Sequence, residues 1–503
     1  KKGTPVTSIE DFTSQYGLVH KIDAFGYLDY LKNDPDAPRK HGKVVLVTAD
    51  TPLKASRGEG KTTTTIALID ALRERGIDAA AVLRQPSMGI TAAGSKGGAS
   101  GGGKASLTHP ELIDWGLCGE MGAIEAAQNL LVSFAEKAID DGKLDDIAVP
   151  RVSDVPSRSL RQIAVDRGKG NVAERVVLTP TCELMQIVVL SRSMDEIAER
   201  VAKMIAGTKD GKAVTFGEFV DLWRITGILS DAVKPAKTET VNGSPVYVHG
   251  GPFANIAHGC NSVIATKMAL KLGDYTITEA GFGADLGAEK FLDIKCRMAE
   301  LKPSAVVVVA TVRALKHHGG VAKADLNAEN LEALEKGLPN LMQHVENITK
   351  VYGLPCVVAI NRFPMDTEAE LKLIEDKCHE VGVNVALSEV WAKGGEGGEE
   401  LAKEVIRLCE TESEFHYCYE TDTTIEEKLD AIVKKIYHGD GVVLTDAAKK
   451  QAKRLTELGF GNYPICMAKT QYSFSDNAKL LGAPKNFTVT VRNLKVSAGA
   501  GFI

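Results

Sequence analysis

The sequence lacks the features that mark membrane proteins, nucleic-acid-binding proteins and proteins stabilised by disulfides or zinc. No apolar run approaches the ~18 residues of a membrane-spanning helix. Basic residues number 60 against 66 acidic ones, and a net charge of -6 provides no broad basic surface for nucleic acid. The nine cysteines include no C-x-x-C pair, which argues against a zinc site or a disulfide framework. Because residues 1–17 also lack the apolar core of a signal peptide, we expect a soluble, cytoplasmic protein.

What the sequence does contain is an alternation of short apolar runs with helical patterns. The run Lys43 to Ala49 is continuous and β-branched, as in a buried parallel strand, and a helical stretch from Lys61 to Arg75 follows it. The same alternation of apolar runs and helical patterns predicts further buried strands at Ala79–Leu83, Glu183–Leu190, Pro245–Val248, Tyr275–Thr278, Ala305–Ala310 and Cys356–Ile360. This alternation predicts an α/β fold: a P-loop-type doubly wound parallel sheet domain with further smaller α/β domains. Ligands of such sheets bind at the carboxyl ends of the strands.

The length of 503 residues predicts roughly three domains. We expect a nucleotide-binding domain over residues 1–340, a second α/β domain over 341–475 and a β-rich segment over 476–503. A glycine-rich stretch, Gly94 to Lys104, predicts a mobile flap near residues 90–120, with a flexible linker as an equal alternative. Because the chain starts without Met, we expect residues upstream of Lys1 to be missing. Because it stops in apolar sequence, we expect the natural chain to continue beyond Ile503.

The strongest local motif is the glycine-rich turn that joins the first predicted strand to its helix. Its sequence, RGEGKTTTT from Arg57 to Thr65, lets backbone N–H groups close around phosphate oxygens at a helix N-terminus. We expect Lys61 to reach the β- and γ-phosphates and the Thr62 hydroxyl to ligate Mg²⁺. Ala55 breaks the strict phosphate-loop pattern, so a chance GKT at a helix start is the alternative. The strand before it and the helix after it favour the phosphate loop.

Three further loops that follow predicted strands carry polar residues. Arg84 is placed either as an oxyanion clamp beside the phosphate loop or in a surface salt bridge. In the loop from His249 to Ser262, His249 and His258 fit a buried structural role as well as a catalytic one. Glu279 and Asp285 are candidates to hold a metal or a water.

Two loops in the second half of the chain carry aromatic residues. The loop Asn361 to Asp366 is similar to the base-recognition loop of some P-loop proteins, although the bare pattern is weak. Phe363 and Trp391 lie at the ends of successive strands and can sandwich a flat ring. For either aromatic alone, core packing is the favoured alternative.

Together these motifs resemble one family, formate–tetrahydrofolate ligase (10-formyltetrahydrofolate synthetase), along essentially the whole chain. The most specific stretches are His249–Ser262, Thr278–Phe291, Ala310–Gly320, Val358–Phe363, Ala386–Gly398 and Ala468–Asp476. The resemblance implies that formate attacks the γ-phosphate of MgATP, giving formyl phosphate and ADP. The amine that bridges the pterin and benzoate of tetrahydrofolate then takes the formyl group and releases phosphate. A cytoplasmic homotetramer is also implied.

The resemblance also implies roles for individual residues. The catalytic residues would be Lys61, Arg84, Phe282 and His258, with Arg84 holding formyl phosphate and Phe282 helping to exclude water. Nucleotide, Mg²⁺ and folate contacts would come from Ser56, Arg57, Gly58, Glu59, Gly60, Lys61, Thr62, Thr63, Asn361, Phe363, Pro364 and Trp391. Of these, Thr62 would be the metal ligand, and Phe363 and Trp391 would stack folate. Residues 1–340 would then carry nucleotide and formyl phosphate, and residues 341–475 the folate side.

Three departures from the family pattern put particular contacts in doubt. The phosphate loop from Thr51 to Lys61 is about two residues longer than the family's. Gln85 replaces the glutamate that usually follows the clamp arginine. The stretch Asp114 to Ala123 lacks both histidines that members commonly carry, and Glu120 replaces their aspartate.

Two other functions remain open at this stage. An ATPase or GTPase switch on the same P-loop scaffold explains the glycine-rich turn and the Asn361–Asp366 loop, but not the aromatic pair. A divergent paralogue that binds folate or nucleotide without ligase activity is suggested by the changes between Asp114 and Ala123. Hydrolysis of ATP without formate would favour the switch, and tetrahydrofolate binding without formyl transfer would favour the paralogue.

Overall fold

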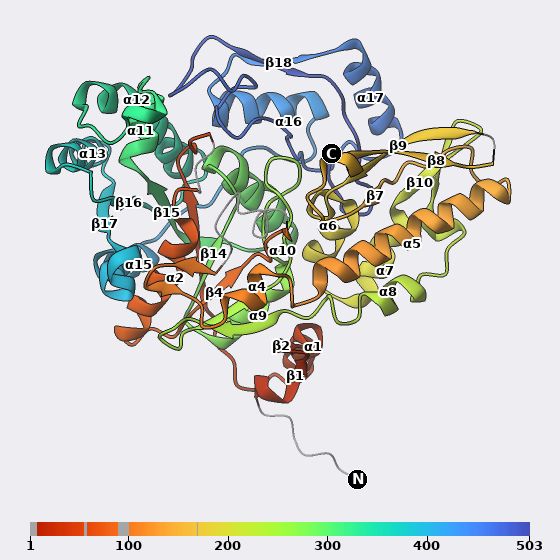
Figure 1. The fold of residues 1–503 in the computed structure, drawn as a ribbon, viewed down its shortest axis with the longest axis horizontal. Helices are drawn as coiled ribbons and strands as arrows, with labels where there is room; N and C mark the ends of the chain where they lie inside the picture. The colour runs from red at the N-terminus through yellow and green to blue at the C-terminus, as the bar shows by residue number, and fades with distance from the viewer. Residues whose placement is uncertain (1–7, 55–57, 89–99, 169) are drawn as a thin grey trace.

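The computed structural model describes the chain outside residues 1–7, 55–57, 89–99 and 169. In this part of the chain a ten-stranded sheet forms the centre (Figure 1). In sheet order its strands are β1 (Thr13–Tyr16), β2 (Val19–Ile22), β12 (Ala236–Glu239), β13 (Pro245–Val248), β4 (Ala79–Leu83), β14 (Tyr275–Glu279), β3 (Lys43–Ala49), β15 (Pro303–Ala310), β16 (Cys356–Asn361) and β17 (Asn384–Ser388).

The sheet is parallel from β13 to β17, and its other three strands continue it in antiparallel pairing. The mostly parallel sheet confirms the predicted α/β class. Five of the six further predicted strands are present, because short β-branched runs between helices are the signature of strands buried on both faces.

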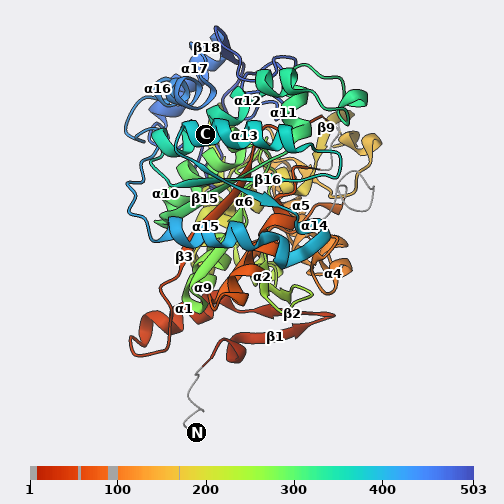
Figure 2. The same cartoon turned by 90° about the vertical axis from the view of Figure 1, so that its left-hand side faces the viewer.

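Neighbouring residues of the central strands point into two separate hydrophobic cores. In β3, Val44 and Leu46 face one core, whereas Val45 and Val47 face the other. This alternation follows from the two-residue period of a strand. The second core is covered by α2 (Lys61–Glu74) and α15 (Glu399–Cys409), which contact each other on one side of the sheet (Figure 2).

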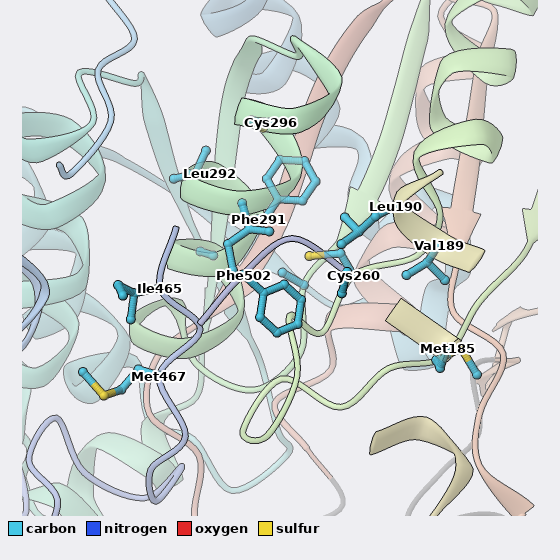
Figure 3. Close-up of a cluster of buried hydrophobic side chains, with 14 of the residues drawn as sticks. Met185, Val189, Leu190, Cys260, Phe291, Leu292, Cys296, Ile465, Met467 and Phe502 are labelled. Carbon is cyan, nitrogen blue, oxygen red and sulfur yellow. The ribbon is translucent and has the colours of Figure 1, made fainter. Parts of the chain in front are cut away.

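The run Glu183 to Leu190, predicted as a strand, is instead the helix α6. Its N-terminus is capped by Cys182, whose Sγ accepts a hydrogen bond from the Met185 amide at 3.4 Å. From Leu184 to Leu190 every residue is buried, so the apolar run has no period that separates a buried helix from a strand. Figure 3 shows Met185, Val189 and Leu190 of this helix beside Cys260, Phe291 and Phe502 in one packed cluster.

Further helices cover the sheet and build two flanking lobes (Figure 1). They are α1 (Ala24–Asn33), α4 (Pro110–Asp114), α5 (Glu120–Asp140), α7 (Met194–Lys203), α8 (Trp223–Ile228), α9 (Val263–Leu272), α10 (Cys296–Ala299), α11 (Val312–His318), α12 (Leu331–Glu346), α13 (Glu368–Glu380), α14 (Val390–Lys393), α16 (Ile425–Ile432) and α17 (Asp446–Glu457). None of the helices in the described ranges is long and apolar enough to cross a membrane.

Short strands lie outside the central sheet. They are β5 (Gly101–Gly102), β6 (Ala105–Ser106), β7 (Arg151–Val152), β8 (Gln162–Asp166), β9 (Asn171–Val177), β10 (Ile205–Lys209), β11 (Lys212–Thr215), β18 (Gly441–Leu444) and β19 (Thr488–Val491). In the C-terminal segment that was expected to be β-rich, β19 pairs in parallel with β18 and the chain around it is irregular.

Two glycines let α11 and α12 pack with their backbones in contact. A Cβ atom at Gly337 of α12 would collide with the Leu315 carbonyl, and one at Gly319, just after α11, would collide with the Ala333 carbonyl. Neither position needs a left-handed backbone, so the close approach alone excludes a side chain. These two helices also carry the residues that hold the start of the glycine-rich turn, as described below.

We predict that Gly337→Ala lowers the free energy of unfolding by about 1–3 kcal/mol, the usual cost of overpacking a close contact. Thermal and urea unfolding of the purified variant will measure the change. The matched control is Gly227→Ala in α8, where an added Cβ meets nothing within 4 Å. There, alanine should leave stability unchanged or raise it slightly. Equal stability of the two variants would contradict the packing argument.

Candidate active site

The loops that carry the predicted site residues lie at one edge of the sheet. Each follows the carboxyl end of a parallel strand: Gly58 to Thr63 follow β3, Arg84 follows β4, Phe282 follows β14, Phe363 follows β16 and Trp391 follows β17. Because the seven parallel strands share a direction, their carboxyl ends meet at the same edge. The structure therefore brings together residues that are separated by more than 300 positions in the sequence.

The glycine-rich turn leads directly into α2, as the motif predicts. Gly60 precedes the helix with φ +92°, a conformation that favours glycine, and its Cα faces the Asn361 side chain. Lys61 is the first helical residue, and its ammonium donates a hydrogen bond to the Phe282 carbonyl at 2.8 Å. The Thr63 hydroxyl donates to the Gly60 carbonyl at 3.0 Å and closes the first turn of the helix.

The buried carboxylate of Glu279 lies where the glycine-rich turn and the arginine loop meet. It accepts a hydrogen bond from the Thr62 hydroxyl at 3.1 Å. Burial raises the pKa of Glu279, and the nearby charges of Lys61 and Arg84 oppose that rise. One carboxylate at the end of β14 therefore interacts with three residues that were predicted separately. Thr62 hydrogen-bonds to it, and the charges of Lys61 and Arg84 act on it.

Arg84 is held in place by the loop after β13. Its Nη1 donates to the Pro252 carbonyl at 2.8 Å, and the Gln85 amide donates to the Gly250 carbonyl at 2.7 Å. The guanidinium also packs against the loop after β14. A Cβ atom at Gly281 in that loop would lie 3.0 Å from both terminal nitrogens of Arg84. Burial lowers the pKa of Arg84, and Glu279 is the first of the groups that oppose this shift.

Glu120 supports the same loop from the other side. Its carboxylate, at the first position of α5, is buried and accepts a hydrogen bond from the Gly250 amide at 2.9 Å. Burial raises the pKa of Glu120 to about 7, although the Gly250 amide and the Lys21 ammonium favour its ionised form. The carboxylate that this chain keeps in place of the family aspartate therefore fixes the loop on which Arg84 rests.

The two histidines of this loop are both fully buried. His249 hydrogen-bonds through Nδ1 to the Ser262 hydroxyl at 2.6 Å and through Nε2 to the Ala232 carbonyl at 2.7 Å, so both ring nitrogens serve the fold. His258 uses Nδ1 for the Gln186 side chain at 2.5 Å, and its Nε2 has no hydrogen-bond partner. Burial lowers the pKa of His258 well below its usual value, so this ring is neutral at pH 7.

The chain that leads from β3 to the glycine-rich turn is anchored at Thr51 by residues that the sequence motifs did not identify. The Thr51 amide donates to Asn340, its hydroxyl hydrogen-bonds to Asn340 and His344, and its carbonyl hydrogen-bonds to His318. Gly482 contacts both Asn340 and His318 through its backbone. His318 lies within the family-specific stretch Ala310–Gly320, but its contact with Thr51 depends on how α11 and α12 pack.

Two buried carboxyl groups lie behind the turn. Glu59 accepts a hydrogen bond from the Thr311 hydroxyl at 2.6 Å and is almost fully buried. Burial and the neighbouring Glu59 raise the pKa of Asp50 well above its usual value, which favours its protonated form. Glu59, predicted as a nucleotide contact, directs its side chain to the protein framework.

Asn361 and Phe363 hold the turn that follows β16. The side-chain amide of Asn361 donates to the Glu59 carbonyl at 3.1 Å, which links this strand end to the glycine-rich turn. The Phe363 amide donates to the Asp366 carboxylate at 2.8 Å. Asp366 therefore shapes its own loop and Asn361 joins that loop to the glycine-rich turn, while Pro364 between them is exposed.

Trp391 is 63% exposed in α14, close to the end of β17. This exposure excludes the alternative that it is a core residue. Its carbonyl accepts a hydrogen bond from the Lys104 amide at 3.0 Å, so part of the expected flap lies against it. Residues 89–99, which include part of the expected flap, lie outside the described residues. The same is true of the predicted contacts Ser56 and Arg57.

Asp285, one of the candidates for a metal or water ligand, is occupied by an ion pair. Its Oδ2 lies 2.8 Å from Lys469 Nζ, and both side chains are buried. In the described part of the chain, no three His, Cys, Asp or Glu side chains are grouped to hold a metal ion. The nine cysteines are all free thiols and eight of them are buried. Thr62 and Glu279 are the neighbouring oxygen-bearing side chains at this point of the site.

The fold and the site define an α/β protein with a glycine-rich turn at the carboxyl edge of a mostly parallel sheet. Residues 8–503 match the sequence profile of formate–tetrahydrofolate ligase, and the chain belongs to this family. A formate–tetrahydrofolate ligase of Bifidobacterium longum (strain NCC 2705) is 83% identical over 305 residues. That alignment spans 60% of this chain and 60% of the relative.

We predict that Glu120→Gln changes the pH dependence of stability. The raised pKa means that native Glu120 keeps a proton that the unfolded chain releases, so its contribution is present below pH 4.5 and is lost as pH rises through about 7. At pH 8 the buried charge costs about 3 kcal/mol, which glutamine avoids while still accepting from Gly250. Melting temperatures at pH 5 and pH 8 should show stabilisation of the variant at pH 8 only.

The matched control for this prediction is Glu329→Gln, at an exposed loop position. It should follow the wild type at both pH values. A Glu120→Gln variant that is no more stable at pH 8 than at pH 5, relative to wild type, would show that the carboxyl does not titrate in this range and would contradict a pKa of about 7.

Proposed function

We propose that this protein ligates formate to tetrahydrofolate at the expense of ATP, through formyl phosphate, giving 10-formyltetrahydrofolate, ADP and phosphate. The observation that carries the proposal is the convergence of Lys61, Thr62 and Arg84 on Glu279 at the carboxyl edge of the sheet. Family membership provides the substrate class, and the geometry supports a site for phosphoryl transfer. A place in one-carbon metabolism follows from the product.

In the first step, a formate oxygen attacks the γ-phosphorus of ATP and the bond from that phosphorus to the bridging oxygen breaks, so that ADP leaves. Formate is a weak nucleophile, so the site must neutralise the charge on the transferring phosphoryl group. Lys61 and the N-terminal amides of α2 are aligned for this role, because the cation and the helix dipole both favour negative charge.

Magnesium fits the oxygen groups at this point of the site. Thr62 supplies a hydroxyl and Glu279 a carboxylate within hydrogen-bonding distance of each other, and Mg²⁺ prefers such ligands together with phosphate oxygens and water. When bound, the ion would offset the charge of the nucleotide phosphates. Thr62 and Glu279 would hold it, with Glu279 also balancing Lys61 and Arg84.

In the second step, the bridging amine of tetrahydrofolate attacks the formyl carbon, the carbon–oxygen bond to phosphate breaks, and the amine loses its proton. Arg84 offers planar, bidentate donors for the phosphate end of this mixed anhydride. Its anchoring on Pro252 fixes the direction of the guanidinium. Phe363 and the exposed Trp391 follow adjacent parallel strands, and a flat pterin ring can stack on such aromatics.

Two properties stay predictions of the resemblance: assembly as a homotetramer and a cytoplasmic location. The contact of Ser56 and Arg57 with nucleotide and the catalytic role of His258 also stay predictions. His258 is buried and neutral, so any part it takes in the reaction is a contact made by Nε2 rather than by a positive charge.

The experiment that tests the function is ADP release from MgATP in four mixtures: with formate, with tetrahydrofolate, with both and with neither. We expect sustained ADP release only with both substrates, and one 10-formyltetrahydrofolate for each ADP. Lys61→Ala should abolish both, because the phosphoryl charge loses its main cation. Hydrolysis that is indifferent to formate would instead identify a nucleotide switch. Folate binding without formyl transfer would identify a paralogue that has lost ligase activity.

Arg84→Lys tests the clamp separately. Lysine keeps the positive charge and loses the planar pair of donors, so we expect kcat/KM for formate to fall at least about tenfold, or roughly 1.4 kcal/mol. Steady-state kinetics with saturating ATP and tetrahydrofolate will measure this. The matched control is Arg407→Lys, where the arginine is exposed on α15. A fall of less than twofold at Arg84 would mean that charge alone is required.

A further inference from the structure

A short hairpin from the glycine-rich stretch lies directly against Trp391. It consists of β5 and β6, which pair as Gly101 with Ser106 and Gly102 with Ala105. At its tip, the Lys104 amide donates to the Trp391 carbonyl at 3.0 Å. The backbone of the hairpin and the backbone of α14 are therefore joined beside the indole ring.

Two consecutive glycines of the hairpin contact the indole itself. A Cβ atom at Gly102 would collide with indole Cζ3 and lie 2.7 Å from Cη2. One at Gly103 would lie 2.9 Å from Cδ2 and 3.0 Å from Cγ. The indole ring thus packs directly against the backbone of the hairpin. No residue with a side chain fits at Gly102 or Gly103 unless the ring moves.

The helix α2 supports both partners of this contact. A Cβ atom at Gly101 of the hairpin would lie 2.6 Å from Cδ1 of Ile66 in α2. On the other side, a Cβ atom at Gly395, just after α14, would lie 3.0 Å from the Cβ of Asp70 in α2. The helix that begins at the glycine-rich turn therefore sets the distance between the hairpin and the indole, although most of that ring is exposed.

We propose that Gly102 and Gly103 are positioning residues for the flat-ring substrate that stacks on Trp391. The hairpin holds the indole in one orientation, so that the substrate meets a preformed surface and does not have to order the side chain on binding. The identity of that substrate as the pterin of tetrahydrofolate rests on the proposed function. The glycines themselves touch the tryptophan, and they act on the reaction through it.

The decisive variant is Gly102→Ala, because Gly102 does not have a left-handed backbone and alanine adds only the collision with the ring. Trp115→Phe and Trp223→Phe leave Trp391 as the sole tryptophan of the chain, and its fluorescence then reports on the ring. In that background we expect Gly102→Ala to increase acrylamide quenching of Trp391 and to lower its anisotropy. The KM for tetrahydrofolate should rise about tenfold, with kcat and the KM values for ATP and formate within twofold.

Two comparisons separate positioning from a general loss of structure. The matched control is Gly122→Ala in α5, where an added Cβ meets nothing within 4 Å, and it should change neither fluorescence nor kinetics. In a Trp391→Phe background the smaller ring leaves room for the alanine, so Gly102→Ala should have little further effect on the KM for tetrahydrofolate.

Unchanged quenching of Trp391 in Gly102→Ala would overturn the proposal, and so would equal effects of Gly102→Ala with and without the indole. A loosened indole with an unchanged KM for tetrahydrofolate would also overturn it, since the orientation would then not matter to the substrate. The four-mixture experiment decides the proposed function independently, because it uses the unaltered chain.

Discussion

The site depends on one buried carboxylate, Glu279, placed between two loops that carry cations. Its strand, β14, lies between β3 and β4, so its carboxyl end falls between the glycine-rich turn and the arginine loop. The charges of Lys61 and Arg84 both favour the ionised form of Glu279, which offsets part of the cost of burying this carboxylate. The order of three strands thus decides which side chains can share a site. In that site the carboxylate of Glu279 offsets the positive charges of Lys61 and Arg84.

Around this carboxylate, the loops hold one another mainly through backbone carbonyls. Lys61 donates to the Phe282 carbonyl and Arg84 to the Pro252 carbonyl, while Glu120 fixes the second of these loops through the Gly250 amide. A phosphate oxygen is a stronger acceptor than a neutral carbonyl, because hydrogen bonds to charged groups are about twice as strong. Under the proposed function, the phosphate groups of the substrates can therefore replace the carbonyls that hold these cations.

The parts of this architecture that depend on local sequence were predictable, and those that depend on packing between distant segments were not. The β-branched run at Lys43 to Ala49 and the turn before Lys61 carry their own signals, and both appear as predicted. The run from Glu183 to Leu190 has no periodicity, so its helical state was set by the core around it. Likewise, no motif marks Asn340 as a partner of Thr51, since that contact exists only once α12 has packed.

The anchoring of Thr51 has a consequence for the order in which the protein can assemble. Thr51, which precedes the glycine-rich turn, is held by Asn340 and His318, and each of these is held by the backbone of Gly482. During synthesis, the turn emerges hundreds of residues before its supports. The entropy of closing so long a chain must be overcome before these hydrogen bonds can form. A nascent chain can therefore build strands and helices early, but the set of hydrogen bonds that holds Thr51 is complete only after Gly482 of these 503 residues has been made.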